Sequence, residues 1–242
     1  MYYRVVDELQ EPQGKVLDSR TVSKNSVRKV RAEQLYTIFD CVGTFSEKED
    51  IKLDVALNIA TFPEIYIPQL KAALGSGRQE VSFGDLGCFM IDREIKIRTL
   101  IEYIQSYQAV CSGAKTRITE KDSDRECVRD YVWEKERRRM NEALPPRGAS
   151  VTLFDDESGA EGYRSDYFGD FASVMQADIR QERAFGRYDM SWFTGVPGSV
   201  TYREAARYAQ NYWKGKANDE PVWEFLLDGT YVLSFPGTVV TE

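Results

Sequence analysis

The two ends of this chain have the composition of β-strands, and the long stretch between them has the periodicity of helices. The N-terminal YYRVV is aromatic and β-branched, which favours a short strand. Apolar residues then recur at helical spacing through most of 24–143. Strand-like composition returns at 150–154 and 221–235. We therefore expect an α+β fold, with residues 1–242 in a single domain and 24–143 as a mostly helical insertion after the first strand.

Local signals predict the elements of the C-terminal part. The acidic DDESG after Phe154 is typical of a turn, and 166–185 has the pattern of a helix. In TYRE, Thr201 and Glu204 have the spacing of a capping box, which predicts a helix up to about residue 214. The pair Asp228-Gly229 favours a hairpin turn between two closing strands.

The composition excludes several classes of enzyme, because the chain contains no histidine. Ser-His-Asp and Cys-His hydrolases and HExxH metalloproteases all need an imidazole. Four widely spaced cysteines form no CxxC pair, so we expect reduced thiols and no metal site. Any catalysis must rest on Glu, Asp, Arg, Lys, Tyr, Ser or Thr.

Charge and hydropathy bear on location and partners. No stretch approaches the roughly 20 apolar residues that cross a bilayer, and the start lacks the basic-then-apolar order of a signal peptide, so we expect a cytoplasmic protein without a membrane partner. The net charge is −7, and residues 151–242 carry all of it, with 15 acidic and 8 basic residues. The net charge alone gives no reason to expect nucleic-acid binding. It does not exclude a locally basic surface on residues 1–150.

Two charged residues stand inside apolar strand segments at opposite ends of the chain. They are Arg4 in YYRVV and Glu224 in VWEFLL. A third segment, LPPRGASVTLF, leads from Arg147 through Ser150 and Thr152 into a strand between the other two. If the strands join one sheet with these side chains on one face, they form an Arg-Ser-Glu site. A structural ion pair between Arg4 and Glu224 would explain the same pattern.

The three segments resemble the ordered signature of the ADP-ribosyltransferase superfamily, of the type found among bacterial and phage-conflict toxins. Its members carry an Arg or His on a first strand, a Ser, Thr or Tyr on a second, and a Glu on a later one. Tyr3-Arg4, Ser150 and Glu224 match these elements in order. The resemblance implies a split β-sheet core that binds NAD as co-substrate. It covers about half of the chain. No glycine-rich dinucleotide loop competes with this interpretation, because GSGRQEVSFG lacks the spacing of GxGxxG.

The resemblance also implies roles for individual residues. Glu224 would hold the nicotinamide ribose and stabilise the positive charge that develops as the N-glycosidic bond breaks. Arg4 would act with it and bind the NAD phosphates or ribose. The NAD-binding residues expected on this basis are Tyr3, Arg4, Arg147, Ser150, Thr152, Tyr163 and Tyr167, with one of the last two tyrosines stacking on nicotinamide.

Departures from the family pattern bear on the acceptor. The sequence has ASVT in place of STS, and Val222 stands where many arginine-modifying members have a second acid. The resemblance implies a mono-ADP-ribosyltransferase toxin, of a toxin-antitoxin or anti-phage system, that is neutralised by an antitoxin protein. Because the second acid is missing, we expect it to modify RNA or DNA. The alternatives are a protein acceptor, or a non-enzymatic protein-interaction module in which Arg4 and Glu224 form a structural pair.

Overall fold

The computed structural model divides the chain into two compact units. It describes all residues except 7–10, 23–24, 88–93, 117–124 and 237–242. Unit 1 comprises 1–31, 133–196 and 206–242, and unit 2 comprises 32–132 and 197–205. From the sequence we expect a single domain with an insertion at 24–143. Most of that insertion lies in unit 2, which also takes in 197–205 from the C-terminal part.

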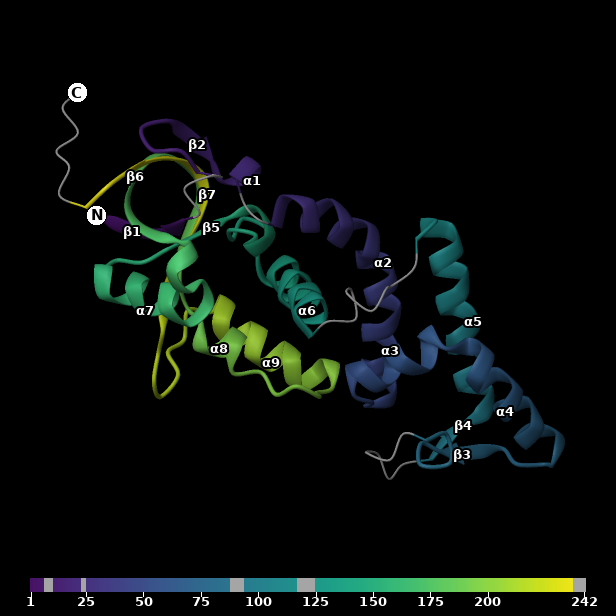
Figure 1. Ribbon diagram of the computed structural model, residues 1–242. Helices are drawn as coiled ribbons and strands as arrows, with labels where there is room; N and C mark the ends of the chain where they lie inside the picture. The colour runs from purple at the N-terminus through teal and green to yellow at the C-terminus, as the bar shows by residue number, and fades with distance from the viewer. Residues whose placement is uncertain (7–10, 23–24, 88–93, 117–124, 237–242) are drawn as a thin grey trace. The chain divides into compact units, whose positions relative to one another are not determined.

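Unit 1 is built on a five-stranded antiparallel sheet. Its strands are β1 (Tyr2–Val6), β2 (Val16–Asp18), β5 (Val151–Leu153), β6 (Ser173–Asp189) and β7 (Trp223–Ser234). The order is β1-β6-β7-β2, and β5 pairs with the first half of β7. Tyr3 and Phe154 form an additional bridge between β1 and the end of β5. The strands β1, β6, β7 and β5 therefore close into a ring, and Figure 1 shows β6 and β7 curving round it.

The interior of this ring holds one apolar core of unit 1, and a second buried cluster, with Val5 and Phe154, lies on the outer face. Alternate residues of a strand project to opposite faces, so one face of each strand points inward. The inward side chains form a cluster of buried residues: Val6, Leu17, Val151, Leu153, Met175, Ala177, Phe225, Leu227, Tyr231 and Leu233. Phe225 and Leu227 belong to it, as their alternation predicts, and the neighbouring Glu224 projects from the other face of β7. The antiparallel sheet, together with the helices of the chain, confirms the expected α+β class.

Short helices connect the strands of the ring, and one of them, α7, packs on its outer face. They are α1 (Ser19–Val22), η1 (Arg147–Ala149), α7 (Glu157–Tyr167), η2 (Gly169–Phe171) and α8 (Ser191–Thr194). The longer helices α6 (Arg125–Met140) and α9 (Tyr202–Trp213) contribute their C-terminal parts to unit 1. Within unit 1, the indole N–H of Trp213 donates to the backbone carbonyl of Trp133 at 2.8 Å, which joins these two helices.

Unit 2 is mainly helical. It contains most of α2 (Asn25–Glu49), together with α3 (Leu53–Thr61), α4 (Pro63–Gly75) and α5 (Ile97–Ala114), and the small hairpin of β3 (Glu80–Ser82) and β4 (Glu94–Lys96). Phe45 and Tyr103 stack in its core with ring centroids 3.7 Å apart. The predicted capping box is confirmed: the Glu204 carboxylate accepts from the Thr201 N–H at 2.8 Å, and the Thr201 hydroxyl accepts from the Glu204 N–H at 3.2 Å.

The helix predicted at 166–185 is wrong. Helix α7 ends at Tyr167, and 173–189 is the long strand β6. Gln, Ala, Arg and Glu in this segment favour a helix locally, but β6 pairs with β1 along its first residues and with β7 along most of its length. The turn predicted at DDESG is shorter than expected: the chain bends at Asp155 and Asp156, and α7 begins at Glu157. Asp156 caps this helix, and its carboxylate accepts from the Gly159 N–H at 2.7 Å.

The hairpin predicted at Asp228-Gly229 is wrong as well, because β7 runs unbroken through both residues. Gly229 lies opposite Glu182 in the ladder, and a Cβ on Gly229 would come within 2.1 Å of the Gln181 carbonyl oxygen. The glycine is required by close approach of two backbones where the ladder has bulges, rather than by a turn. Asp228 is buried and binds Arg183 and Arg20 at 2.9 and 2.8 Å.

Candidate functional site

The carboxylate of Glu224 is completely buried, although it lies near the start of a strand. Its backbone is held on both sides, since Glu224 lies opposite Tyr188 of β6 and the next residue, Phe225, lies opposite Leu153 of β5. With Phe225 in the core of the ring, the Glu224 side chain must leave on the outer face. The pairing of three strands thus fixes the direction in which this carboxylate projects.

Three side chains from three different elements surround the carboxylate. Arg147 of η1 forms an ion pair with Oε1 through Nη1. The hydroxyl of Tyr212, on α9, donates to the same oxygen at 2.8 Å. The Thr152 hydroxyl, on β5, lies 3.5 Å from Oε2. A buried carboxylate is stable only when it is paired and hydrogen-bonded, and Arg147 and Tyr212 meet that requirement here. We call Glu224, Arg147, Tyr212 and Thr152 the Glu224 cluster.

Aromatic rings hold the guanidinium of Arg147. Its Cζ lies 4.2 Å from the ring centroid of Phe193, in α8, and 5.2 Å from that of Tyr212. A cation above an aromatic face is attracted by the ring quadrupole, and the effect is stronger in a partly desolvated position. The side chain of Arg147 is 19% exposed and that of Glu224 is 0% exposed. Of this ion pair, only Arg147 therefore has surface in contact with solvent.

Both tyrosines beside Glu224 stay protonated at neutral pH. Burial raises the pKa of Tyr212 well above its usual value; the charge of Arg147 opposes this shift, and Glu224 adds to it. Burial also raises the pKa of Tyr188 to about 12, with Arg137 opposing the shift and Glu224 adding to it. The two rings stack with centroids 4.8 Å apart. Tyr212 can accordingly accept from Arg147 while it donates its proton to Glu224.

Two more residues that we expected at the site, Tyr163 and Tyr167, lie on α7, where the ring of Tyr163 is 5.1 Å from that of Phe154 on the outer face. Burial raises the pKa of Tyr163 on α7, and Glu224 raises it further while Arg147 opposes the shift, so the phenol lies within the field of both charges. Tyr167 packs on Tyr163 with centroids 4.8 Å apart and is 55% exposed. The two tyrosines thus form an aromatic pair that extends from the outer face of the ring to the surface.

In the expected Arg-Ser-Glu signature, Ser150 is the serine of the second strand. Its hydroxyl is buried. Within the part of the chain that the structure describes, this oxygen has no hydrogen-bond partner. Ser150 lies three residues after Arg147 and two before Thr152, at the entry to β5. Buried hydroxyls without a partner are uncommon, because the loss of hydration is not offset. A ligand hydroxyl or amide could supply the missing bond.

Arg4 belongs to a different group of side chains. Its Nε and Nη2 donate to the two carboxylate oxygens of Glu11 at 2.7 and 2.6 Å, and its Nη1 donates to the Thr152 carbonyl at 3.2 Å. The Tyr231 hydroxyl completes the group with a 2.6 Å bond to Glu11. Burial alone would lower the pKa of Arg4, but Tyr231 and Glu11 raise it, and the net shift is upward.

The expectation that Arg4 and Glu224 face one cleft is therefore wrong. Tyr231, which binds Glu11 beside Arg4, packs in the same cluster as Phe225, inside the ring. Glu224 is adjacent to Phe225 and projects from the outer face. Arg4 and Glu224 do not form the structural pair of the alternative interpretation either, since each has its own partner of opposite charge. Tyr3 lies on the outer face with Phe154, one residue away from Arg4.

Sequence reasoning did not select Tyr212, Phe193 or Tyr188, which complete the surroundings of Glu224 and Arg147. Tyr212 lies in YWKG, close before the Glu strand, but nothing in its spacing indicates that α9 turns this ring toward Glu224. Tyr188 was not selected, because the local sequence of β6 favours a helix and so does not indicate which strand residue lies opposite it. Once β6 is known to be a strand, its antiparallel register places Tyr188 opposite Glu224 directly.

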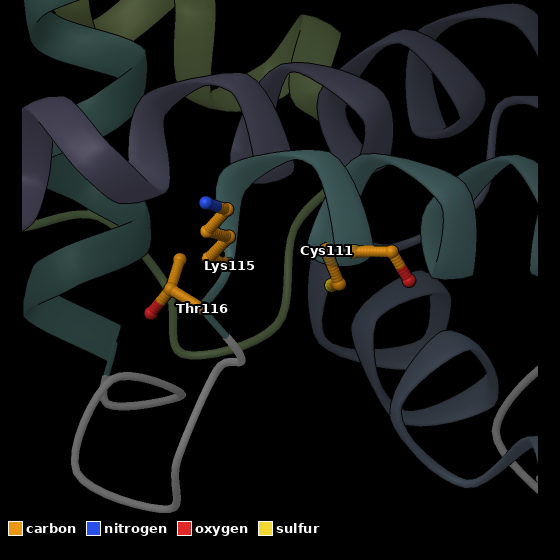
Figure 2. A pocket seen from close by; sticks show the side chains of 4 residues that line it. Cys111, Lys115 and Thr116 are labelled. Carbon is orange, nitrogen blue, oxygen red and sulfur yellow. The ribbon is translucent and has the colours of Figure 1, made fainter.

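A hollow of another kind lies at the C-terminal end of α5, in unit 2. It is lined by Cys111, Ser112, Lys115 and Thr116. Figure 2 shows Cys111 on the last turn of α5 and Lys115 and Thr116 just after the helix ends. The described lining residues include neither a carboxylate nor an aromatic ring. This hollow therefore has less chemistry to offer than the Glu224 cluster.

Comparisons with known proteins do not assign the chain to a family. No protein-family model matches it, and no curated protein matches it significantly. Among the described residues, no group of three or more Cys, Asp or Glu side chains is placed to hold a metal ion. None of the described helices combines the length and apolar composition that spanning a bilayer requires.

Proposed function

We propose that this chain is an NAD-dependent ADP-ribosyltransferase whose catalytic carboxylate is Glu224. The observation that carries the proposal is the Glu224 cluster itself: a fully buried carboxylate, fixed by three strands and held by Arg147 and Tyr212. Such a preorganised negative charge is suited to stabilising a positive charge that develops on a sugar. On this proposal, unit 1 is the ADP-ribosyltransferase-like core.

The donors around Glu224 fit the chemical groups of NAD. Arg147 is a partly exposed cation that can bind the pyrophosphate. Ser150 has a buried hydroxyl that lacks a partner and can bond to a ribose hydroxyl or the carboxamide. Tyr163, with Tyr167 beside it, can stack on nicotinamide. Arg147 thus takes the anion-binding part that we expected from Arg4, and Arg4 supports the interior of the ring.

Ligand binding must open the ion pair, because Glu224 has no exposed surface. The pyrophosphate offers Arg147 a second anion. If the guanidinium turns toward it, Oε1 of Glu224 becomes free to accept a ribose hydroxyl. The bond between C1′ and nicotinamide then breaks, its electron pair leaves with the nicotinamide, and an acceptor oxygen or nitrogen bonds to C1′ and releases its proton to solvent. Glu224 stabilises the positive charge on the ribose while this happens.

The finer parts of the proposal rest on the family resemblance. They are a nucleic-acid acceptor, a role as a toxin of a toxin-antitoxin or anti-phage system, and an antitoxin protein as partner. A cytoplasmic location is proposed instead from the hydropathy of the sequence. One observation favours a second candidate function, a non-enzymatic interaction module. The Arg147–Glu224 pair is closed, and a closed buried pair also serves as a structural element.

Release of nicotinamide from NAD separates these functions. We expect the wild-type protein to release nicotinamide and Glu224→Gln to do so at least about 100-fold more slowly, as for the loss of a preorganised electrostatic group. Glu220→Gln is the matched control, because Glu220 is exposed and lies just before β7. Turnover that is the same in Glu224→Gln and wild type would refute the assignment of Glu224. Absence of both NAD binding and turnover in the wild type would favour the interaction module.

A further inference from the structure

Asp189 is the last residue of β6, and its carboxylate is fully buried, like that of Glu224. In the ladder it lies opposite Trp223, the residue before Glu224. All three hydrogen bonds that the structure gives Asp189 come from backbone N–H groups. Oδ1 accepts from Ser191 at 3.0 Å and from Val222 at 2.9 Å, and Oδ2 accepts from Asn218 at 2.7 Å. Bonds from N–H groups to an ionised carboxylate are among the stronger hydrogen bonds in proteins. Asp189 therefore joins three points of the main chain.

Two of these points lie in the segment that connects the members of the Glu224 cluster. Residues 214–222 run from the end of α9, which carries Tyr212, to the start of β7, which carries Glu224. Most of this segment is exposed and has no regular secondary structure. Its attachment through Asn218 and Val222 fixes the main chain two residues before Glu224. The entry of the chain into β7 thus depends on a buried acid.

The third main-chain group that Asp189 binds is the N–H of Ser191, in α8. Ser191 is the first residue of α8, and its N–H bond to Asp189 sets the start of this short helix. Phe193, two residues later, is the ring that lies 4.2 Å from the guanidinium of Arg147. The Asp189 carboxylate is therefore hydrogen-bonded both to the segment 214–222, which leads to Glu224, and to α8, which carries the ring beside Arg147.

We propose that Asp189 is a positioning residue that fixes Glu224 against Arg147 through the main chain at Val222 and Ser191. Its importance for turnover rests on the function proposed above. The geometry requires a carboxylate, because three N–H groups point at two acceptor oxygens. An asparagine has one acceptor oxygen and an NH₂ group, so at least one N–H would face another donor at a side chain that is itself fully buried.

The test compares Asp189→Asn with Asp228→Asn. Asp228 is a matched control, because it is also a buried acid of this sheet and also hydrogen-bonded, but to Ser19, Arg20 and Arg183 rather than to the segment before Glu224. Both variants should lower the unfolding temperature. We would measure kcat and KM for nicotinamide release well below that temperature, and amide hydrogen exchange over residues 214–225.

Asp189→Asn should lower kcat by about 10- to 100-fold, as a misplacement of the reacting groups by about 1 Å does, and leave KM for NAD little changed. Its amides at 214–225 should exchange faster than in wild type. Asp228→Asn should keep the wild-type kcat and the wild-type exchange in this segment. The split between kcat and KM and the local exchange both go beyond what general destabilisation would change.

Each contrary result has a distinct meaning. Wild-type kcat in Asp189→Asn would overturn the inference, and so would an equal loss of kcat in Asp228→Asn. Failure of the proposed function would show itself separately, as no turnover in the wild type or full turnover in Glu224→Gln. In that case the hydrogen exchange decides alone: unchanged exchange at 214–225 in Asp189→Asn would overturn the positioning role, and faster exchange would support it.

Discussion

Replacing Arg147 by methionine should lower the free energy of unfolding by about 3 kcal/mol. Methionine keeps much of the apolar stem beside Phe193 but removes the positive charge. Glu224 is then left completely buried without its ion-pair partner, and removal of one member of a buried pair costs about 3–5 kcal/mol. We take the lower end, because the 19% exposure of Arg147 lets water reach the oxygen that it leaves. The bond from Tyr212 remains and limits the loss further.

Urea unfolding of four proteins measures this effect. They are wild type, Arg147→Met, Glu224→Gln and the double variant. Because the double variant has no uncompensated charge, its loss should be smaller than the sum of the single losses, with a coupling energy of about 1–3 kcal/mol. Arg187→Met is the control. Arg187 is exposed and lies over the Trp223 ring at 4.0 Å, so this change should cost less than about 1 kcal/mol.

Two results would refute the reasoning. One is a loss in Arg147→Met no larger than in Arg187→Met. The other is simple additivity of Arg147→Met and Glu224→Gln, since the ion pair could not then be what holds the buried carboxylate.

Two further predictions concern the sheet. Gly229→Ala should lower the free energy of unfolding by about 3 kcal/mol in thermal or urea unfolding, because its Cβ would overlap the Gln181 carbonyl. The control is Gly162→Ala in helix α7, where no atom lies within 4 Å of the added Cβ, and this change should raise the free energy of unfolding by about 0.5–1 kcal/mol. Equal effects of the two changes would contradict the close approach at Gly229. Burial would raise the pKa of Asp228, but hydrogen bonds from its arginines lower it overall. The stabilisation is therefore present above the unfolded-state pKa of about 3.9 and is lost as pH falls through the lower folded-state pKa, so Asp228→Asn should show a weaker acid dependence of unfolding than wild type.

The parts of the fold that follow from local chemistry were predictable. The strand at Tyr2–Val6, the helices of unit 2 and the start of α9 at Thr201 all depend on side chains within a few residues of one another. The strand β6 and the continuity of β7 were not predictable in this way. Their state depends on pairing between 173–189 and 223–234, and that pairing overrides helix propensity in one segment and a turn signal in the other.

The candidate site divides along the same line. The sequence by itself determined which side chains are unusual: an acid at 224 in an apolar strand, a cation at 147 before another strand, and no histidine to replace them. Only the tertiary structure decided that Glu224 is paired with Arg147, 77 residues away, and not with Arg4. The reason is that a strand's sequence specifies alternation between two faces, whereas the choice of inner and outer face, and of the partner found there, depends on how the whole sheet closes.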